Sequence, residues 1–157
     1  NVRMLTSHGV FSKAELESRT EIMLDNYCKS VRIEAVTMSF MARTQIEPAV
    51  ASYSRELAET CSAKKGVCPA SACAYETKVV MRLSELLDEI ERRTDDLDAA
   101  VSALDGSSDV IAQSTMIRDS VIPAMSDLRS VCDEAETVVS KKFWPFPVYG
   151  DLLFSVQ

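Results

Sequence analysis

The sequence is poor in the residues that build turns and sheets. It has four glycines and five prolines in 157 residues, and aromatic residues make up only 6% of it. Alanine, serine, glutamate, leucine and valine dominate instead, which favours helices and disfavours a turn-rich β-sandwich. Apolar residues make up 46%, so the chain can bury a core as one domain or as a domain with an extension.

The sequence also lacks an excess of positive charge and a long apolar run. Twenty-four acidic residues against seventeen basic ones give a net charge of −7, which disfavours a nucleic acid as partner. No apolar run approaches the roughly 18–20 residues of a membrane span, and the start shows no signal-peptide pattern, so no membrane partner is expected. The chain begins at Asn1 rather than at a methionine, and we expect it to be a fragment of a longer protein.

Cysteine and histidine are sparse. The cysteines are odd in number and two lie in strongly helical stretches, which favours free thiols in a reducing compartment over a disulfide framework. We therefore expect a cytoplasmic protein. Three cysteines follow one another at spacings of seven and five without a CxxC pair, which favours loop thiols over a zinc site. The cysteines are Cys28, Cys61, Cys68, Cys73 and Cys132, and the single histidine is His8.

Signatures of catalysis are missing as well. Neither GxGxxG nor GxxxxGK[ST] occurs, and paired ExxH motifs are absent. Because a nucleophile–base pair could use only His8, we assign no catalytic, cofactor-binding or metal-binding residue. The acidic residues between 85 and 98 are interpreted as a solvated helix face rather than a cation site. Glu34, close to the apolar side of its helix, is interpreted as a buried carboxylate in an ion pair across a subunit contact rather than as a catalytic group.

A first long helix is predicted from about residue 13 to 65. Gly9 closes a short helix before it, and Ser12 with Glu15 forms a capping box at its start. Apolar residues then recur on one helical face, with Pro48 as the one breaker, where we expect a kink or a change of packing partner rather than an end of the helix. About fifty residues would span roughly 75 Å. That length exceeds a compact globule, so part of this helix is expected to pack on protein outside the chain.

Two further helices carry heptad-like seams. After a predicted loop over 62–74, the second helix has apolar residues at spacings of three and four, and the third helix repeats this spacing across Pro123. The connection around 105–108 is short, which makes the two helices antiparallel neighbours. The fold class predicted is therefore all-α, an antiparallel bundle of three long helices. The seams are Val80, Leu83, Leu87, Ile90, Thr94, Leu97, Val101 and Leu104, then Val110, Ser114, Ile117, Val121, Ala124, Leu128, Val131, Ala135 and Val138.

The last residues, KKFWPFPVYGDLLFSVQ from Lys141, change character. They concentrate aromatic residues, and two prolines hold the segment extended. Such an apolar segment favours docking on other protein. We expect a docking tail over 143–157, and the candidate subunit or domain contacts are Glu34, Trp144, Phe146, Tyr149, Leu152 and Phe154.

Three blocks of sequence resemble a known family. They are GVFSKAELESRTEIMLDNY (9–27) leading into RIEAVTMSFMARTQIEPAVASY (32–53), then VIPAMSDLRSVCDEAE (121–136), and finally the carboxy-terminal segment itself. Together they resemble the carboxy-terminal region of type III glutamine synthetases, the long form of that enzyme, and the pattern IEAxTMxxMAxxQIxPA is the most specific part. Thr20, where an aromatic residue is expected, and the cysteine-containing loop depart from the family pattern.

The resemblance implies a parent enzyme that joins ammonia to glutamate with ATP and Mg²⁺ or Mn²⁺. Its catalytic motifs would lie upstream, so no catalytic residue is carried onto this chain. Residues 1–27 would end the catalytic domain's helical layer, 28–142 would form a helical bundle extension, and 143–157 the docking tail. The family's double-ringed dodecamers imply a homo-oligomer, with the upstream catalytic domain and neighbouring subunits as partners, and a structural role for this region.

The sequence leaves two alternative functions. A freestanding adaptor or scaffold bundle that binds a partner helix would suit the seams and acidic faces equally well, but it would have no reason to carry the family-like blocks or to lack an initiator methionine. An enzyme complete in itself is disfavoured by the missing histidine, metal and phosphate motifs.

Overall fold

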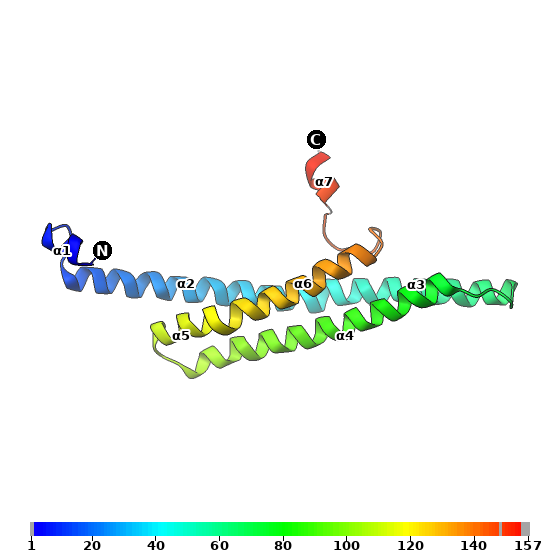
Figure 1. Cartoon of the computed structure of the whole chain (residues 1–157), viewed down its shortest axis with the longest axis horizontal. Coiled ribbons are helices and arrows are strands. Elements are labelled where there is room, and N and C mark those ends of the chain that lie inside the picture. The colour runs from blue at the N-terminus through cyan, green and yellow to red at the C-terminus, as the bar shows by residue number, and fades with distance from the viewer. Residues whose placement is uncertain (1, 148, 155–157) are drawn as a thin grey trace.

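The computed structural model describes residues 2–147 and 149–154 of the chain, and most of these residues lie in helices, with no strand among them (Figure 1). The prediction of an all-α chain with three long helical segments is confirmed. The elements are α1 (Val2–Ser7), α2 (Lys13–Met41), a π-helical turn (Ala42–Ile46), α3 (Glu47–Val67), α4 (Ala74–Ala103), a 3₁₀ turn (Leu104–Gly106), α5 (Val110–Met116), a second π-helical turn (Ile117–Val121), α6 (Ile122–Val138) and α7 (Tyr149–Phe154).

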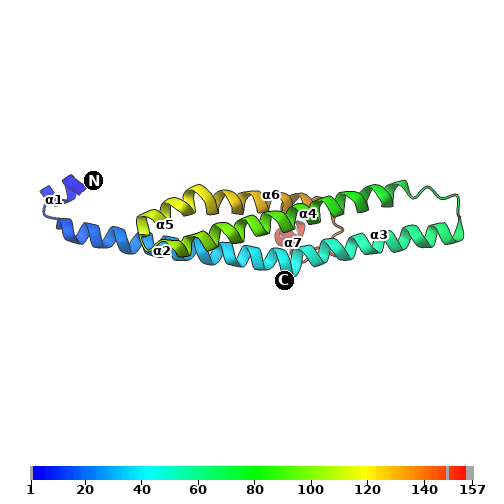
Figure 2. The ribbon, with the colours of Figure 1, turned by 90° about the horizontal axis from the view of Figure 1, so that it is seen from below.

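The three long segments lie side by side. Helices α2 and α3 join into one rod that runs the length of the molecule, α4 returns along it, and α5 with α6 runs back again along α4 (Figures 1 and 2). Both ends of the rod extend past the third segment. The start of α2 continues beyond α5, and the tip formed by the end of α3 and the start of α4 continues beyond α6. Helix α7 points away from the other helices.

The start of the rod has the predicted caps. Gly9 adopts φ +66°, the left-handed conformation that glycine takes after a helix. The hydroxyl of Ser12 accepts a hydrogen bond from the Glu15 N–H at 3.2 Å, and the Glu15 carboxylate accepts one from the Ser12 N–H at 2.7 Å. This reciprocal capping box satisfies two backbone donors that a helix start leaves unpaired.

Pro48 does not interrupt the rod as a kink would. The Glu47 N–H just before it donates to the carbonyl of Ala42, five residues back, so the helix widens by one residue per turn. The helix widens in the same way before Pro123, where the Ile122 N–H donates to the carbonyl of Ile117. A proline lacks an N–H and clashes with the preceding turn of a regular α-helix, and the wider turn accommodates both defects.

The two prolines belong to one repeated pattern. Residues 41–49 read MARTQIEPA and residues 116–124 read MIRDSVIPA, so both segments have the form M-x-R-x-x-[IV]-x-P-A. Each repeat spans one π-helical turn and the start of the α-helix that follows it. The shared pattern is the sequence signal from which the two wide turns could have been predicted.

The predicted seams line the core, and α4 buries more than one seam. Leu83, Ile90 and Leu97 are fully buried, as are Ile117 and Leu128 on the third segment. Leu86, outside the predicted seam, is 2% exposed, whereas Leu87 inside it is only half-buried. Since α4 contacts α3 on one side and α6 on another, its apolar face is wider than the narrow stripe of a two-stranded coiled coil.

The predicted loop over 62–74 is shorter in the structure. Residues 62–67 continue α3, and the connection is limited to 68–73. The lysines at 64 and 65 explain the extension, because they favour helix and their charges suit the negative carboxy-terminal end of its dipole. Cys73, at φ +46°, precedes α4.

The wider apolar face of α4 can be tested with neighbouring leucines. We expect Leu86→Ala to lower the free energy of unfolding by roughly 2–5 kcal/mol, as for other buried leucines. Leu87→Ala should cost clearly less, because Leu87 is half-buried. Urea unfolding followed by circular dichroism measures both variants, and equal losses would contradict the packing of Leu86.

Candidate functional site

The described residues hold no arrangement typical of an active site. No three histidine, cysteine, aspartate or glutamate side chains among them converge to hold a metal ion. His8 is exposed beside the short helix α1.

Carboxylates of α4 are engaged in ion pairs with arginines. Arg43, within the first π-helical turn, contacts Asp95 at 2.6 Å and also pairs with Asp98. Arg93 joins Glu89 of its own helix at 2.9 Å to Asp127 of α6 at 2.8 Å. These contacts are exposed or part-buried and individually weak, and they connect α4 with the segments on both sides of it.

Glu34 is exposed on this chain and lines a groove on α2. Its helix turns Ala35 and Val31 towards the core, and Glu34 lies beside that face. The predicted ion pair of Glu34 across a subunit contact stays a prediction. Two other carboxylates are shielded from water within the chain, since Glu76 is buried and Glu47 is half-buried, and their environments differ.

Glu47 lies beside the first π-helical turn with one oxygen shielded from water. Its Oε1 atom has no hydrogen-bond partner among the residues that the structure describes. Burial raises the pKa of the Glu47 carboxyl, the nearby charge of Arg43 opposes that shift, and Glu91 and Asp95 add to it. Ionised Glu47 is therefore a local cost to the fold at neutral pH.

Glu76 lies in the first turn of α4, and a nearby positive charge compensates the burial of its carboxylate. Its side chain is 6% exposed and pairs with Lys64 of α3. The hydrogen bond from Lys64 lowers the pKa of the Glu76 carboxyl, so the ionised form is favoured in the folded chain.

The first part of the tail lies on the chain itself. Phe143 meets the ring of Tyr53 on α3 with centroids 5.5 Å apart, and Lys142 pairs with Glu56 at 3.1 Å. Trp144 and Phe146 stand edge to face at 6.2 Å. Both help to line a groove of about 480 Å³ between α2 and α6, which we call the tail groove and whose walls include Glu34, Met38, Met125 and Arg129.

Helix α7, farther along the tail, is exposed, and its Asp151 pairs with Lys141. Leu152 is 64% exposed and Phe154 is 80% exposed on α7. The side chain of Tyr149 lies outside the described residues. Of the predicted contact residues, the structure thus brings Glu34, Trp144 and Phe146 together in the tail groove and leaves Leu152 and Phe154 outside it.

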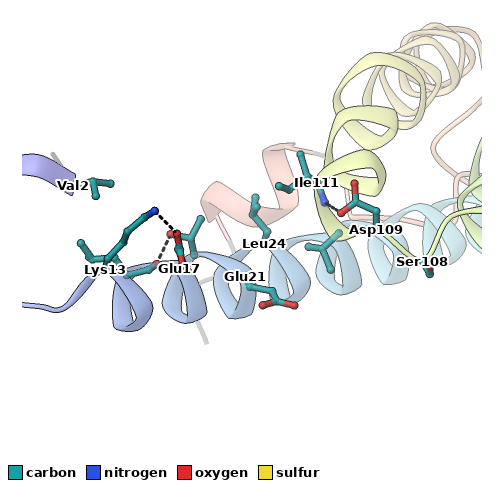
Figure 3. A pocket seen from close by; sticks show the side chains of 11 residues that line it. Val2, Lys13, Glu17, Glu21, Leu24, Ser108, Asp109 and Ile111 are labelled. Atoms are coloured by element: carbon teal, nitrogen blue, oxygen red, sulfur yellow. Dashed lines mark hydrogen bonds and ion pairs between the residues drawn. The ribbon is translucent and has the colours of Figure 1, made fainter.

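A second groove lies at the other end, between α1, the start of α2 and the start of α5. It has a volume of about 500 Å³. Leu24 rises from α2 towards Ile111 on α5, and Lys13 pairs with Glu17 at 3.5 Å on its rim (Figure 3). The Asp109 carboxylate beside it accepts hydrogen bonds from the N–H groups of Ile111 and Ala112, which caps α5.

The outer face of α2 carries four exposed large apolar side chains, and sequence reasoning did not single it out. Four large side chains at spacings of 11, 3 and 4 share one face of the helix. We call this surface the α2 stripe. It consists of Ile22, Ile33, Val36 and Phe40, exposed by 57%, 67%, 52% and 61%. An apolar series of this length on one helix face is typical of a surface that contacts other protein.

No helix in the described part of the chain is long and apolar enough to cross a membrane.

Residues 1–65 match the family model of the glutamine synthetase C-terminal domain. All 157 residues align at 31% identity with a glutamine synthetase of Butyrivibrio fibrisolvens, covering 22% of that protein. A type-3 glutamine synthetase of Dictyostelium discoideum is 27% identical over 98% of the chain, and a glutamine synthetase of Bacteroides fragilis is 26% identical over 97%. The chain spans about a fifth of the length of these relatives, in their carboxy-terminal part.

The unpaired carboxylate of Glu47 predicts an unusual pH dependence. Its folded-state pKa is raised above the ordinary 4.5, so the stability tied to this group is present below that value and is lost as the pH rises through the folded-state pKa. Glutamine stays uncharged at every pH. We expect Glu47→Gln to raise the free energy of unfolding near neutral pH and to make no difference near pH 4, as measured by urea unfolding at about pH 7 and about pH 4.

Glu76→Gln is the matched control. The pKa of Glu76 is lowered in the folded chain, so its stabilisation is present above the ordinary value and is lost as the pH falls through the folded-state pKa. The control should therefore be less stable than the wild type near neutral pH. If both variants shifted stability in the same direction, the contrast between the two sites would be wrong.

Proposed function

The chain is similar along its length to the carboxy-terminal region of glutamine synthetases, a type-3 enzyme among them, and from this we propose that it is the non-catalytic carboxy-terminal helical domain of such an enzyme. The longer protein would ligate ammonia to glutamate with ATP, and ATP and Mg²⁺ or Mn²⁺ would bind to parts outside this chain. The role of this region is structural. It braces the catalytic domain and supports assembly of a cytoplasmic homo-oligomer, for which the family suggests a dodecamer.

The α2 stripe is the observation that carries this proposal. Its four side chains are more than half exposed, and burying them in a contact would remove a substantial apolar area from water. The stripe lies on α2, which forms the first part of the rod (Figures 1 and 2). An upstream domain packed on this side would cover apolar surface that the three helical segments leave open.

The tail supports the same role in a second way. Its first part holds to the helices through Phe143, Trp144 and Phe146, and α7 then presents Leu152 and Phe154 to the outside. Within the longer protein the three long helices form an antiparallel bundle whose tail reaches a neighbouring domain or subunit. A net charge of −7 disfavours nucleic acid as that neighbour.

The proposed division of labour follows position along the chain. Residues 1–27 complete the catalytic domain's helical layer, 28–142 form the bundle and 143–157 dock. The matched residues 1–65 cross the first of these boundaries within the continuous helix α2. The boundary between residues 27 and 28 therefore divides residues by the part of the protein that they are proposed to contact, and it does not divide the chain into two folding units.

The α2 stripe provides the direct test. In the longer protein, Ile33→Asp combined with Phe40→Asp should shift the assembly towards smaller species, since both charges would enter the proposed contact. The isolated chain should keep its helix content, because both residues are exposed in it. Light scattering after size exclusion measures assembly, and circular dichroism measures helix content.

Met81→Asp is the control for the stripe. Met81 is 61% exposed on α4, as Phe40 is on α2, but it lies on another element. An assembly unchanged by the double substitution, or equally weakened by Met81→Asp, would argue against the stripe as a contact.

The adaptor function remains the alternative, and the size of the native polypeptide separates the two. An antibody against this chain should detect a band several times larger than 17.3 kDa in lysate of the source organism. An ATP-, glutamate- and ammonia-dependent assay of that species would follow. A band at 17.3 kDa would support a freestanding helical module instead.

A further inference from the structure

The tip of the α3–α4 hairpin is stabilised differently from the rest of the molecule. The two helices extend there beyond α6, so they have only each other to pack on (Figures 1 and 2). The connection over 68–73 is made of small residues, a proline and two cysteines. The Lys64–Glu76 ion pair joins the helices at this tip, and a second link of another kind lies beside it.

That second link is a contact between two cysteines from different helices. Cys61 lies in the last part of α3, and Cys73 is the residue that precedes α4. The Cys73 thiol donates a hydrogen bond to the carbonyl oxygen of Cys61 at 3.6 Å. The hydroxyl of Ser71 is 3.7 Å from the Cys73 sulfur.

The two thiols differ in accessibility. Cys73 is 6% exposed, whereas Cys61 is half-buried. A reagent in solution therefore reaches Cys61 first, with Cys73 held behind it. The contact with Cys73 raises the pKa of Cys61, and Lys65 opposes that shift. A raised pKa keeps the thiolate fraction small at neutral pH, so exchange of Cys61 with a disulfide in solution is slow.

We propose that Cys61 and Cys73 are a modification site, where a low-molecular-weight disulfide such as oxidised glutathione converts the two thiols into a reversible disulfide that joins α3 to α4. This inference is independent of the proposed role in a glutamine synthetase. It rests on the contact between the Cys73 thiol and the backbone of Cys61 and on the position of both residues at the tip, and it applies to the chain in any assembly.

The chemistry consists of two exchange steps. Cys61 gives its proton to solvent, and its sulfur attacks one sulfur of the reagent, forming a mixed disulfide and releasing one reagent thiolate, which takes up a proton. Cys73 then loses its proton, and its sulfur attacks the Cys61 sulfur, which forms the protein disulfide and releases the second reagent thiol. Two protein thiols lose two electrons and one reagent disulfide gains them, so an excess of the reduced reagent reverses the reaction.

The reaction can be followed by mass spectrometry on the purified chain. It is incubated in mixtures of oxidised and reduced glutathione, free thiols are alkylated, and the chain is digested with trypsin. Cleavage after Lys64 and Lys65 places Cys61 on one peptide and both Cys68 and Cys73 on another. We expect the two peptides to be linked between Cys61 and Cys73, and the link to disappear when reduced glutathione is in excess.

The melting temperature of the oxidised chain is a second measurement of the same disulfide. A disulfide across a loop of this size should raise the melting temperature by roughly 6–12 °C, from the usual stabilisation by short-loop disulfides in a domain of this length. Cys28 and Cys132 serve as internal references, since both are buried on other helices and burial raises the pKa of Cys132 to about 11. Both should remain reduced in the folded chain.

Two variants make the test specific. Cys68→Ser removes the exposed neighbour and should leave the link and the rise in melting temperature intact. Cys61→Ser should abolish both while the helix content stays the same. A link through Cys68, glutathione retained on Cys61 without a link to Cys73, or no reaction at all would each overturn the proposal.

Discussion

The packing of α4 between two neighbours is the constraint on which the rest of the structure depends. Its fully buried residues, such as Leu83, Ile90 and Leu97, face α3 on one side and α6 on another. Neither neighbour alone could cover a stripe of that width. The long rod and the third segment are therefore held mainly through α4, and the arginines 43 and 93 reinforce both contacts from the outside.

The regular parts of this architecture were predictable because helical periodicity is a local property of the sequence. The seams over 80–104 and 110–138, the capping box at Ser12 and the turn at Gly9 all follow from spacings of a few residues. The burial of Leu86 and the extension of α3 to Val67 were not predicted. Leu86 is buried because α4 has a second packing partner, and α3 extends because of two lysines in a stretch whose other residues are typical of a loop.

The candidate site was less accessible to sequence reasoning. The resemblance pointed to glutamine synthetases, and the aromatic tail was recognised as apolar, but the shielded carboxylates of Glu47 and Glu76 were not predicted. On a helix with apolar residues over much of its surface, spacing alone does not say which side faces the core. The same ambiguity concealed the α2 stripe, because Ile33 and Phe40 look like core residues until the neighbouring helices are placed.

The wide turns before Pro48 and Pro123 allow the length of a helix to change without a change in the direction that its side chains face. In a regular α-helix, adding one residue rotates everything downstream by about 100°, so length and facing cannot change independently. A π-helical turn takes up the added residue locally, and the segments on either side keep the faces they had. The rod can thus gain a residue, and with it a proline that stiffens the backbone, without turning the side chains of α3 away from α4.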